Sequence, residues 1–221
     1  LNASASVRSR SSAKGAVDLR AAVRQSDPMQ PPAPFADDLD LTLAEAFKLL
    51  TRGVVDRRSA FRTIQVATVA AGGAPEVRTV VLRAFEPAER RLRFHTDRRS
   101  GKFAQLGRDP RVMLHGYDPG AKIQLRMAGR ATIHIDDAVA DDAWARTAPM
   151  GRACYAITPG PGTVVAAPIA APEDQPHARD QFAAVRVTID TLDWLWLSAH
   201  GHRRARFAWA GGELASRWLV P

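Results

Sequence analysis

The first regular pattern of apolar residues along the chain has the period of a helix. Apolar side chains recur every three or four positions at Leu43, Phe47, Leu50 and Val54. That spacing places them on one face of a helix. Thr42 and Glu45 have the spacing of a capping box, and the arginines at 57–58 suit a helix C-terminus. We therefore predict a helix that begins at residue 42 and ends near residues 57–58.

Beyond this helix the pattern changes to short β-rich runs separated by turn residues. Runs at such hairpin spacing are typical of antiparallel strands. They lie at residues 62–70, 76–85, 91–96, 111–117 and 122–135, with three closing runs at 182–198, 203–210 and 214–220. Gly129 interrupts the long run 122–135 and predicts a β-bulge there.

Further helices are placed between these strands rather than alternating with each of them. Ser100 is positioned to cap a short helix that Pro110 ends, and residues 136–147 suit a helix with acidic residues in its first turn. Residues 158–180 are rich in proline and predict a loop. Because strands and helices do not alternate, the pattern argues against a parallel sheet. It predicts a mainly β fold with α additions, a barrel of six or more antiparallel strands.

The first 38 residues lack a sustained apolar period. They are rich in serine, alanine, arginine and proline, a composition that buries too little apolar surface to stay folded. We therefore expect a disordered tail over residues 1–38 and one domain over residues 39–221, a length that suits a single domain.

Composition bears on the cellular location that we expect for the chain. Hydrophobic residues make up 46% of the chain, yet no apolar run approaches the roughly 20 residues of a membrane helix. The N-terminal segment has no apolar stretch of the secretory type. The single cysteine, Cys154, excludes an internal disulfide. We expect a cytoplasmic protein with no membrane partner.

The charge balance favours anionic partners. The chain has 31 Lys and Arg against 23 Asp and Glu, a formal net charge of +8, and arginine supplies almost all of the excess. Basic proteins bind nucleic acids or phosphorylated small molecules, although a bias toward arginine gives the same total. A nucleic-acid surface needs a continuous basic face with exposed aromatic rings. The tryptophans lie mostly in apolar strands instead, so no nucleic-acid partner is expected.

Several common site motifs are missing from the sequence. No glycine-rich dinucleotide fingerprint follows a strand, and no GxxxxGK[ST] phosphate loop occurs. The histidines form no HExxH pattern, so no metal site is expected. Ser198 lies near His200, but no GxSxG elbow supports a nucleophile.

Three segments concentrate groups that bind phosphate. They are residues 78–83, which begin and end with arginine, residues 95–102, and Gln124. A phosphate needs guanidinium groups, hydroxyls and a helix N-terminus as donors. Residues 95–102 supply a threonine at a strand end, a serine at a helix start and a lysine in its first turn. Each part alone is typical of a solvated strand face or a helix cap, so the order of the parts carries the prediction.

These segments resemble the pyridoxamine 5′-phosphate oxidase-like family of flavin mononucleotide (FMN) binding proteins. The similarity lies in RTVVLRAF, LRFHTDRRSGKFAQLGRDPRVMLHGYDP, KIQLRMAGRA, LDWLWLSAHGHRRARFAW and RWLVP, and extends from about residue 41 to residue 221. The resemblance implies a six-stranded antiparallel split β-barrel, so residues 39–221 would be an FMN-binding split-barrel domain. It also implies a homodimer with FMN in the clefts between the subunits.

The resemblance assigns cofactor contacts residue by residue. Ser100 and Lys102 would hold the phosphate, and Gln124 would reach the flavin across the dimer. The strand 78–83 would line the flavin and its phosphate, and a tryptophan of the 194/196 pair would pack on the cofactor. The implied set is Arg78, Thr79, Val80, Val81, Leu82, Arg83, His95, Thr96, Ser100, Lys102, Gln124, Trp194 and Arg206.

One spacing within this set leaves two interpretations. Arg78 and Arg83 are an odd number of residues apart, so they would face opposite sides of a regular strand. Either a bulge intervenes or the two arginines serve different parts of the ligand.

The sequence departs from the true oxidases where those proteins bind substrate. Their closing Arg-Leu-His-Asp-Arg run reads His202 to Arg206 here, so the cofactor arginine is kept and the substrate histidine is lost. The helix that addresses the substrate phosphate is also altered. The chain therefore resembles a sister branch, with substrate candidates at Arg83, Trp144, Arg152 and Arg203.

The resemblance implies an FMN-dependent oxidoreductase that transfers hydride between FMN and a small substrate, which is phosphorylated in the oxidases. The flavin carries this chemistry, so no catalytic residue is assigned. The alternative is a flavin-binding or sensing module without turnover. Neither the substrate nor the electron acceptor follows from the sequence.

Overall fold

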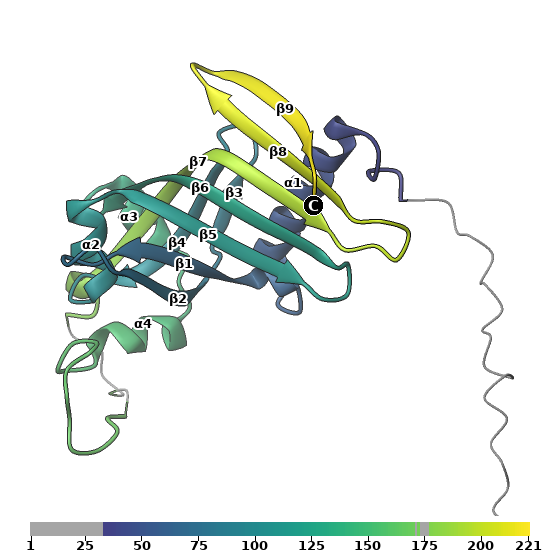
Figure 1. Ribbon diagram of the computed structural model, residues 1–221. Coiled ribbons are helices and arrows are strands. Elements are labelled where there is room, and N and C mark those ends of the chain that lie inside the picture. The colour runs from purple at the N-terminus through teal and green to yellow at the C-terminus, as the bar shows by residue number, and fades with distance from the viewer. Residues whose placement is uncertain (1–32, 171, 173–176) are drawn as a thin grey trace, which may run out of the picture. The chain divides into compact units, whose positions relative to one another are not determined.

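An antiparallel sheet of nine strands carries most of the chain, and helices pack against it (Figure 1). The computed structural model describes residues 33–170, 172 and 177–221, so residues 1–32 of the predicted tail lie outside the described residues. The strands are β1 (Thr63–Val69), β2 (Pro75–Val81), β3 (Ala84–Glu86), β4 (Arg91–Asp97), β5 (Arg111–Asp118), β6 (Ile123–His134), β7 (Phe182–Trp196), β8 (Arg203–Ala210) and β9 (Glu213–Leu219). The helices are α1 (Leu39–Val55), α2 (Gly101–Arg108), α3 (Ala138–Ala145) and α4 (Pro149–Ala156), with 3-10 turns at Ala60–Arg62 and Arg179–Gln181. The predicted mainly β fold with α additions is confirmed.

The order of the strands shows that the sheet curls. Hydrogen-bonded neighbours follow the order β2-β1-β5-β6-β7-β4-β3, with β8 beside β7 and β9 beside β8. The strands β2 and β3 end this path, yet only Leu82 and Arg83 separate them along the chain. The two ends of the sheet therefore lie next to each other. Within the described ranges no pairing of β2 with β3 closes the sheet.

The long strand β7 belongs to two parts of the sheet. Its first half pairs with β4 and its second half with β8, while β6 pairs with both halves. The register with β6 shifts beside Gly129, and Asp190 of β7 is the extra residue. A Cβ at Gly129 would lie 2.1 Å from the Thr188 carbonyl oxygen, so only glycine fits there. The predicted irregularity at Gly129 is confirmed, and it marks the point where β7 changes neighbours.

Alternation of side chains along the strands creates two apolar cores. The inner face of the curled sheet and α1 enclose the larger one, which contains Ile64, Phe94 and Val187. The outer face of β4 and of the first half of β7 carries a smaller cluster with α3 and α4, which contains Tyr155 and Phe182. Neighbouring residues of β4 therefore point into different surroundings.

The helix α1 begins earlier than predicted, so the capping box at Thr42 and Glu45 is wrong. Asp38 is the N-cap, and its carboxylate accepts a hydrogen bond from the Leu41 N–H. The Thr42 hydroxyl lies inside the first turn and donates to the Asp38 carbonyl. Asp38 is the better cap because its charge also suits a helix N-terminus. The helix also ends earlier than predicted, at Val55.

The folded unit starts a few residues before position 39. Phe35 packs edge-on against Trp194 and Trp196, with ring centroids 5.7 and 5.4 Å apart. Ala36 is fully buried. These contacts hold the described end of the predicted tail against the sheet.

The predicted strand 76–85 is two strands. The first part, β2, pairs with β1, whereas β3 pairs with β4. In the link, the Leu82 N–H donates to the Arg62 carbonyl and the Arg83 N–H donates to the Arg93 carbonyl. The break places Arg78 and Arg83 beside different strands, so the two arginines lie in different surroundings.

The predicted helix 136–147 is shorter than expected, and a second helix follows it. Asp137 caps α3, and Pro149 lies in the first turn of α4. A proline has no N–H and restricts the residue before it, so it ends one helix and suits the start of the next. The substrate candidates Trp144 and Arg152 therefore lie on different helices.

Candidate functional site

The N-terminus of α2 gathers the phosphate-binding candidates on the inner side of the sheet. Arg78 of β2 and Thr96 of β4 face inward, because each pairs with an inward position of the neighbouring strand. Ser100 directly precedes α2, and Lys102 lies in its first turn. We name one set of residues the α2 cluster: Thr68, Arg78, Thr96, Ser100, Lys102 and Gln105.

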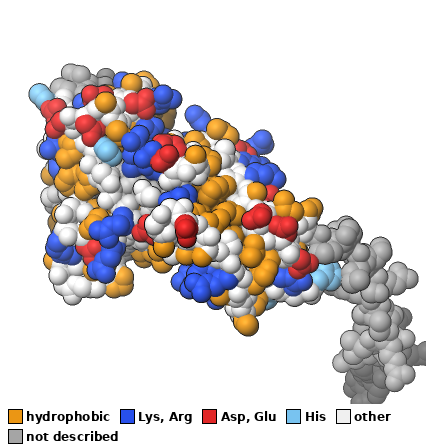
Figure 2. Space-filling view, turned by 90° about the horizontal axis from the view of Figure 1, so that it is seen from above, with side chains coloured by type: hydrophobic (Ala, Val, Ile, Leu, Met, Phe, Trp, Pro, Cys, Tyr) orange, Lys and Arg blue, Asp and Glu red, His pale blue; other side chains and the backbone are white. Residues whose placement is uncertain are grey.

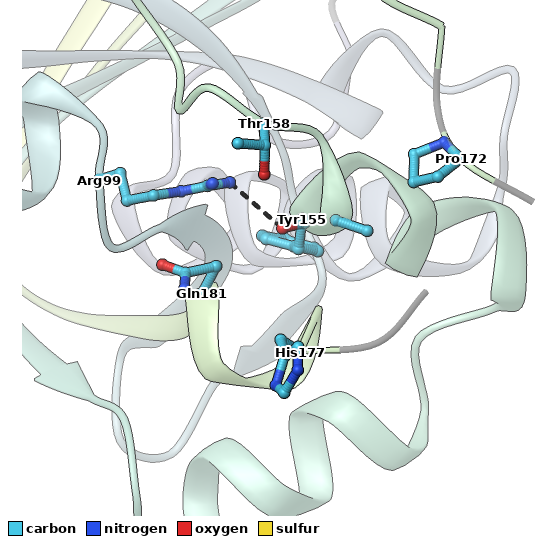
Figure 3. Close-up of a pocket in the computed structure, with 7 residues that line it drawn as sticks. Arg99, Tyr155, Thr158, Pro172, His177 and Gln181 are labelled. Carbon is cyan, nitrogen blue, oxygen red and sulfur yellow. Dashed lines mark hydrogen bonds between the residues drawn. The ribbon is translucent and has the colours of Figure 1, made fainter. Parts of the chain in front are cut away.

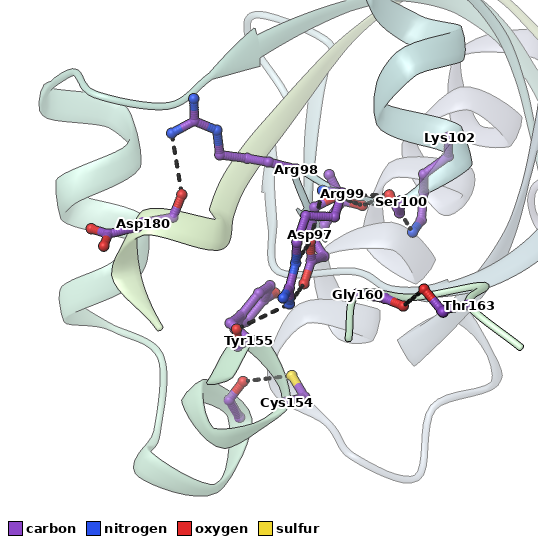
Figure 4. Close-up of polar contacts among 12 residues, drawn as sticks. Asp97, Arg98, Arg99, Ser100, Lys102, Cys154, Tyr155, Gly160, Thr163 and Asp180 are labelled. Carbon is purple, nitrogen blue, oxygen red and sulfur yellow. Dashed lines mark hydrogen bonds and ion pairs between the residues drawn. The ribbon is translucent and has the colours of Figure 1, made fainter. Parts of the chain in front are cut away.

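Hydroxyl groups connect the end of β4 to the start of α2 (Figure 4). The Ser100 hydroxyl donates to the Asp97 carbonyl at 2.7 Å and lies 3.0 Å from the Thr96 hydroxyl oxygen. The Lys102 ammonium donates to the Ser100 Oγ at 3.4 Å. The Ser100 side chain therefore caps no N–H group of α2. A helix N-terminus of this kind, beside a lysine, is suited to an anion.

Two residues that the sequence did not single out hold the Arg78 guanidinium. It donates to the Thr68 hydroxyl and, at 3.1 Å, to the Gln105 Oε1, while the Thr68 hydroxyl itself donates to Gln105. Thr68 and Gln105 are both buried. On the exposed side, Glu76 pairs with Arg78 at 2.9 Å. The only signal in the sequence was a polar residue at an inward position of an apolar strand.

Positive charge is in excess in the α2 cluster. Burial and, next, the nearby Arg78 guanidinium lower the pKa of Lys102, and the Asp97 carboxylate opposes them only in part. A lowered lysine pKa means that the ammonium is costly in its surroundings, and a bound anion offsets that cost. The residues present therefore fit a phosphate monoester.

His95 lies on the other face of β4, away from Thr96. Its ring packs edge-on against Phe182 at 4.8 Å, and neither ring nitrogen has a partner among the described residues. Burial, followed by the Arg83 and Arg93 guanidinium groups, lowers the pKa of His95 to about 3. The imidazole is therefore neutral near pH 7.

Arginines surround this histidine. The Nε atoms of Arg83, Arg93 and Arg186 are buried, and no described residue accepts a hydrogen bond from them. Arg93 pairs through Nη1 with Asp142 of α3 at 3.1 Å. We name Arg83, Arg93, His95 and Arg186 the His95 group. Buried donors without partners are uncommon in folded proteins, so these groups need acceptors that the described residues do not supply.

The substrate candidates are not gathered in one place. Trp144 packs against Phe182 at 5.2 Å, and the Arg152 guanidinium lies 4.9 Å from the Trp144 ring. Because Phe182 also contacts His95, Trp144 and Arg152 lie at the edge of the His95 group, to which Arg83 belongs. Arg203 lies elsewhere, paired at 2.8 Å with Asp37 in the segment before α1.

Gln124 lies on the outer face of the sheet, in a row of three polar side chains. The His115 Nδ1 is 2.9 Å from the Gln65 Oε1, and its Nε2 is 3.2 Å from the Gln124 Oε1. The row crosses the neighbouring strands β1, β5 and β6. Exposed apolar side chains share this face: Val77, Met113 and Tyr117.

Arg206 lies on the same outer face, farther along the sheet. It pairs across with Asp193 of β7, which in turn lies opposite Arg126 of β6. The Asp193 carboxylate accepts hydrogen bonds from Arg206 and from Arg204, each at 3.0 Å. Burial alone would raise the pKa of Asp193, but the bonds from Arg204 and Arg206 outweigh it and the pKa is lowered.

The remaining cofactor candidates divide between the core and the outer face. Val80 and Leu82 are buried in the core, whereas Thr79 and Val81 face outward. Trp194 is fully buried, and its indole N–H has no partner in the described part of the chain. Four of the predicted residues therefore lie at the N-terminus of α2: Arg78, Thr96, Ser100 and Lys102. Arg83 lies beside His95. Gln124 and Arg206 lie on the outer face of the sheet.

A cavity of about 300 Å³ lies near the turn between β4 and α2 (Figure 3). None of the predicted site residues lines it. Arg99, Tyr155 and Gln181 are among the residues that line it. The Arg99 guanidinium donates to the Tyr155 carbonyl at 3.2 Å and pairs with Asp97 at 2.6 Å. These contacts join the end of β4 to α4, so Arg99 supports the α2 cluster from outside.

Basic side chains do not form one continuous stripe on the face shown in Figure 2. Lys and Arg gather there in separate groups, with carboxylates and apolar side chains between them.

Within residues 33–170, 172 and 177–221, no three His, Cys, Asp or Glu side chains are placed to hold a metal ion. No helix in this part of the chain is long and apolar enough to cross a membrane.

Solved structures define the class to which this fold belongs. A pyridoxamine 5′-phosphate oxidase-related, FMN binding protein from Nostoc punctiforme PCC 73102 matches with a TM-score of 0.67 at 25% identity, over 87% of this chain and 100% of that one. PhzG from Burkholderia lata 383, in complex with tetrahydrophenazine-1-carboxylic acid, matches with a TM-score of 0.65 at 20% identity, over 86% and 97%. The fold is that of the FMN-binding split barrels, and the sheet is not closed.

The family follows from the sequence. Residues 44–135 match the family described as the FMN-binding domain of pyridoxamine 5′-phosphate oxidase. Pyridoxine/pyridoxamine 5′-phosphate oxidase 2 of Arabidopsis thaliana is 33% identical in a match of 109 residues that covers 45% of this chain and 54% of that protein. The chain thus spans about half the length of this curated relative. Residues 44–135 thus match the FMN-binding domain family of the pyridoxamine 5′-phosphate oxidases, in agreement with the predicted family and with FMN as the predicted cofactor.

Proposed function

We propose that this protein is an FMN-dependent oxidoreductase acting on a small molecule. The α2 cluster carries the proposal, because two cations, three hydroxyls and a helix N-terminus lie together there with excess positive charge. That combination suits the phosphate of FMN. FMN, when bound, supplies hydride transfer at its N5 atom.

In this proposal the residues of the chain bind and orient the reactants. Arg78 and Lys102 hold the phosphate through charge-assisted hydrogen bonds, and Ser100 adds a hydroxyl. Thr68 and Gln105 keep the Arg78 guanidinium in place, so little ordering is needed when the anion binds. No proton-transfer residue is assigned.

We also propose a homodimer in which the outer face of each chain completes the flavin site of its partner. Gln124 and Arg206 lie on that face, whereas the α2 cluster lies on the inner side of the sheet. A second copy can bring the two sets together across a two-fold interface. The exposed apolar residues beside Gln124 support burial of this face against another chain.

Dilution tests the dimer. A ligand that binds only the dimer must stabilise it, and FMN at 100 times its dissociation constant adds about 2.7 kcal/mol per site. Analytical ultracentrifugation should therefore detect monomer at higher protein concentrations without FMN than with it. A protein that stays monomeric while binding FMN tightly would contradict the shared site.

The His95 group supports a small substrate with hydrogen-bond acceptors, anionic or carbonyl-bearing. Arg83 and the neutral His95 ring offer donors there, and Trp144 and Arg152 border it. The oxidases' substrate histidine is absent from the run that ends at Arg206. A substrate group that loses its hydrogen-bonding partner is left unpaired, which lowers catalytic efficiency steeply, so we expect pyridoxine 5′-phosphate to be oxidised poorly. Steady-state efficiency equal to that of a genuine oxidase would refute this.

A flavin-binding module without turnover is the second candidate. The packing of Arg152 on Trp144 and of Trp144 on Phe182 favours it, because these contacts fill the edge of the His95 group.

A cytoplasmic location stays part of the proposal and rests on the single cysteine, Cys154.

Two measurements separate these functions. The first is the absorption spectrum of the purified protein after incubation with FMN and gel filtration, where retained flavin bands are expected. The second follows bleaching of the bound flavin without oxygen on addition of pyridoxine 5′-phosphate, NADH or NADPH, and its return with oxygen. Bleaching by one donor supports the enzyme, and retained flavin that no donor reduces supports the module. A protein that retains no flavin contradicts both.

A further inference from the structure

Asp193 is a buried carboxylate that holds two arginines of β8. It is 6% exposed. Arg204 donates through Nε to its Oδ1 at 3.1 Å and through Nη2 to its Oδ2 at 3.0 Å. Arg206 donates through Nη2 to the Oδ2 at 3.0 Å. Because Arg204 and Arg206 are two residues apart on a strand, both side chains leave the same face of the sheet.

The two arginines use the carboxylate differently. Arg204 makes a two-pronged contact, and its side chain is 26% exposed. Arg206 makes a one-pronged contact, and its side chain is 41% exposed. Within the described residues, the hydrogen bonds of Arg206 engage only the Nη2 atom. The contact with Asp193 fixes the guanidinium, and no described residue accepts a hydrogen bond from its remaining N–H groups.

The surrounding charges make this carboxylate necessary. Arg126 lies across from Asp193 on β6, and Arg217 lies across from Arg206 on β9. Four arginines therefore share one outer surface with one acid between them. Without the carboxylate, the guanidinium groups would repel each other and the long Arg206 side chain would sample many rotamers.

We infer that Asp193 is a positioning residue of the flavin site, which fixes the Arg206 guanidinium so that its remaining N–H groups are directed at FMN. The inference rests on the proposed function, in which Arg206 contacts the flavin. Asp193 itself needs no contact with the cofactor. A fixed guanidinium loses less conformational entropy when the ligand binds, so affinity depends on Asp193 only while Arg206 is present.

A double-mutant cycle in the full-length protein tests this dependence. The variants are Asp193→Asn, Arg206→Ala and the pair, and the measured quantity is the FMN dissociation constant from flavin fluorescence. We expect about tenfold weaker binding in Asp193→Asn and at least that in Arg206→Ala. The double variant should bind as Arg206→Ala does, because residues that act through one another are non-additive.

A matched control separates positioning from general stability. The Asp109 side chain, at the C-terminal end of α2, makes a similar two-pronged contact with Arg111, and its hydrogen bonds involve no predicted site residue. Asp109→Asn should leave the FMN dissociation constant unchanged. If Asp193→Asn does not fold, as judged by thermal unfolding of the apoprotein, the smaller Asp193→Ser replaces it in the cycle.

Each remaining outcome overturns the inference. Wild-type affinity in the Asp193 variant, or losses that add in the double variant, would show that Asp193 does not act through Arg206. An equal loss in Asp109→Asn would show an effect of stability alone. Failure of the wild-type protein to bind FMN would overturn the proposed function as well, and is distinguished by the wild-type titration.

Discussion

The α2 cluster and the His95 group lie on opposite faces of the same strand, β4, and differ in how their polar atoms are satisfied. In the α2 cluster, hydrogen bonds join Thr68, Arg78 and Gln105 in one set and Thr96, Ser100 and Lys102 in a second. In the His95 group, both imidazole nitrogens and three arginine Nε atoms have no described partner. An unsatisfied buried polar group costs about 1–3 kcal/mol. The first region is therefore a preformed anchor, whereas the second is kept at a cost to stability, which is typical of a site that awaits a ligand.

Removing a cation from the α2 cluster should have the largest effect. Arg78→Ala or Lys102→Ala loses a charge-assisted hydrogen bond to the phosphate, of about 1.5–3 kcal/mol. FMN should then bind roughly ten- to a hundred-fold more weakly, as measured by titration of each apo-variant. Lys48→Ala, on the exposed side of α1, is the control and should bind normally. Wild-type affinity for FMN in both variants would show that Arg78 and Lys102 do not hold the phosphate.

The His95 group should make stability depend on pH. The pKa of His95 is lowered to about 3, against about 6.5 for an unfolded histidine. Below pH 6.5 the unfolded chain takes up a proton that the folded chain refuses, so the free energy of unfolding falls as the pH falls from 6.5 toward 4. The slope should approach about 1.4 kcal/mol per pH unit. Urea unfolding at several pH values measures it, and His95→Phe should lose the slope. An equal slope in both proteins would show that His95 is not held neutral.

Adjacent residues of β4 should respond to loss of polarity with opposite signs. His95→Phe replaces a ring without partners and should stabilise the apoprotein by up to about 1 kcal/mol. Thr96→Val removes a partner of Ser100 and should destabilise it by about 1 kcal/mol. Urea midpoints near pH 7 give both numbers. Shifts of both midpoints in the same direction would show that the polar groups on the two faces of β4 do not differ in this way.

The α2 cluster could be predicted in large part because it is local in the sequence. Thr96, Ser100 and Lys102 belong to one strand–turn–helix segment, and their spacing follows from that local structure. Thr68 and Gln105 could not be predicted, because their role depends on which strand and which helix face meet Arg78. Such pairing is decided by packing and has no motif.

The His95 group was not visible as a unit in the sequence. His95 and Thr96 were expected on the same ligand, but side chains alternate along a strand, and α3 and α4 cover the His95 side. That cover depends on the break before Pro149, where two helices replace the single predicted one. The strand order and the curl of the sheet likewise depend on distant pairings. The mainly antiparallel class followed from turn spacing alone.

Glu76→Gln should have the smallest effect on FMN affinity of these variants, and it tests how Arg78 is held in the α2 cluster. Glu76 pairs with Arg78 from the exposed side and competes with the phosphate for the same guanidinium. Exposed ion pairs contribute less than about 1 kcal/mol, so FMN should bind up to a few-fold more tightly in the variant. The same FMN titration detects this. Weaker binding would mean that Glu76 orients Arg78 for the ligand instead of competing with it.

If the α2 cluster anchors the flavin by its phosphate, the wild-type apoprotein must bind FMN more tightly than riboflavin, and titration with each ligand measures the two affinities. The two ligands differ only in the phosphate. Loss of two charge-assisted contacts predicts at least about a hundred-fold preference for FMN. The preference should shrink in the Arg78→Ala/Lys102→Ala double variant, because FMN loses its anchors while riboflavin loses nothing. Equal affinity of the wild-type protein for FMN and riboflavin would show that the α2 cluster does not hold the phosphate.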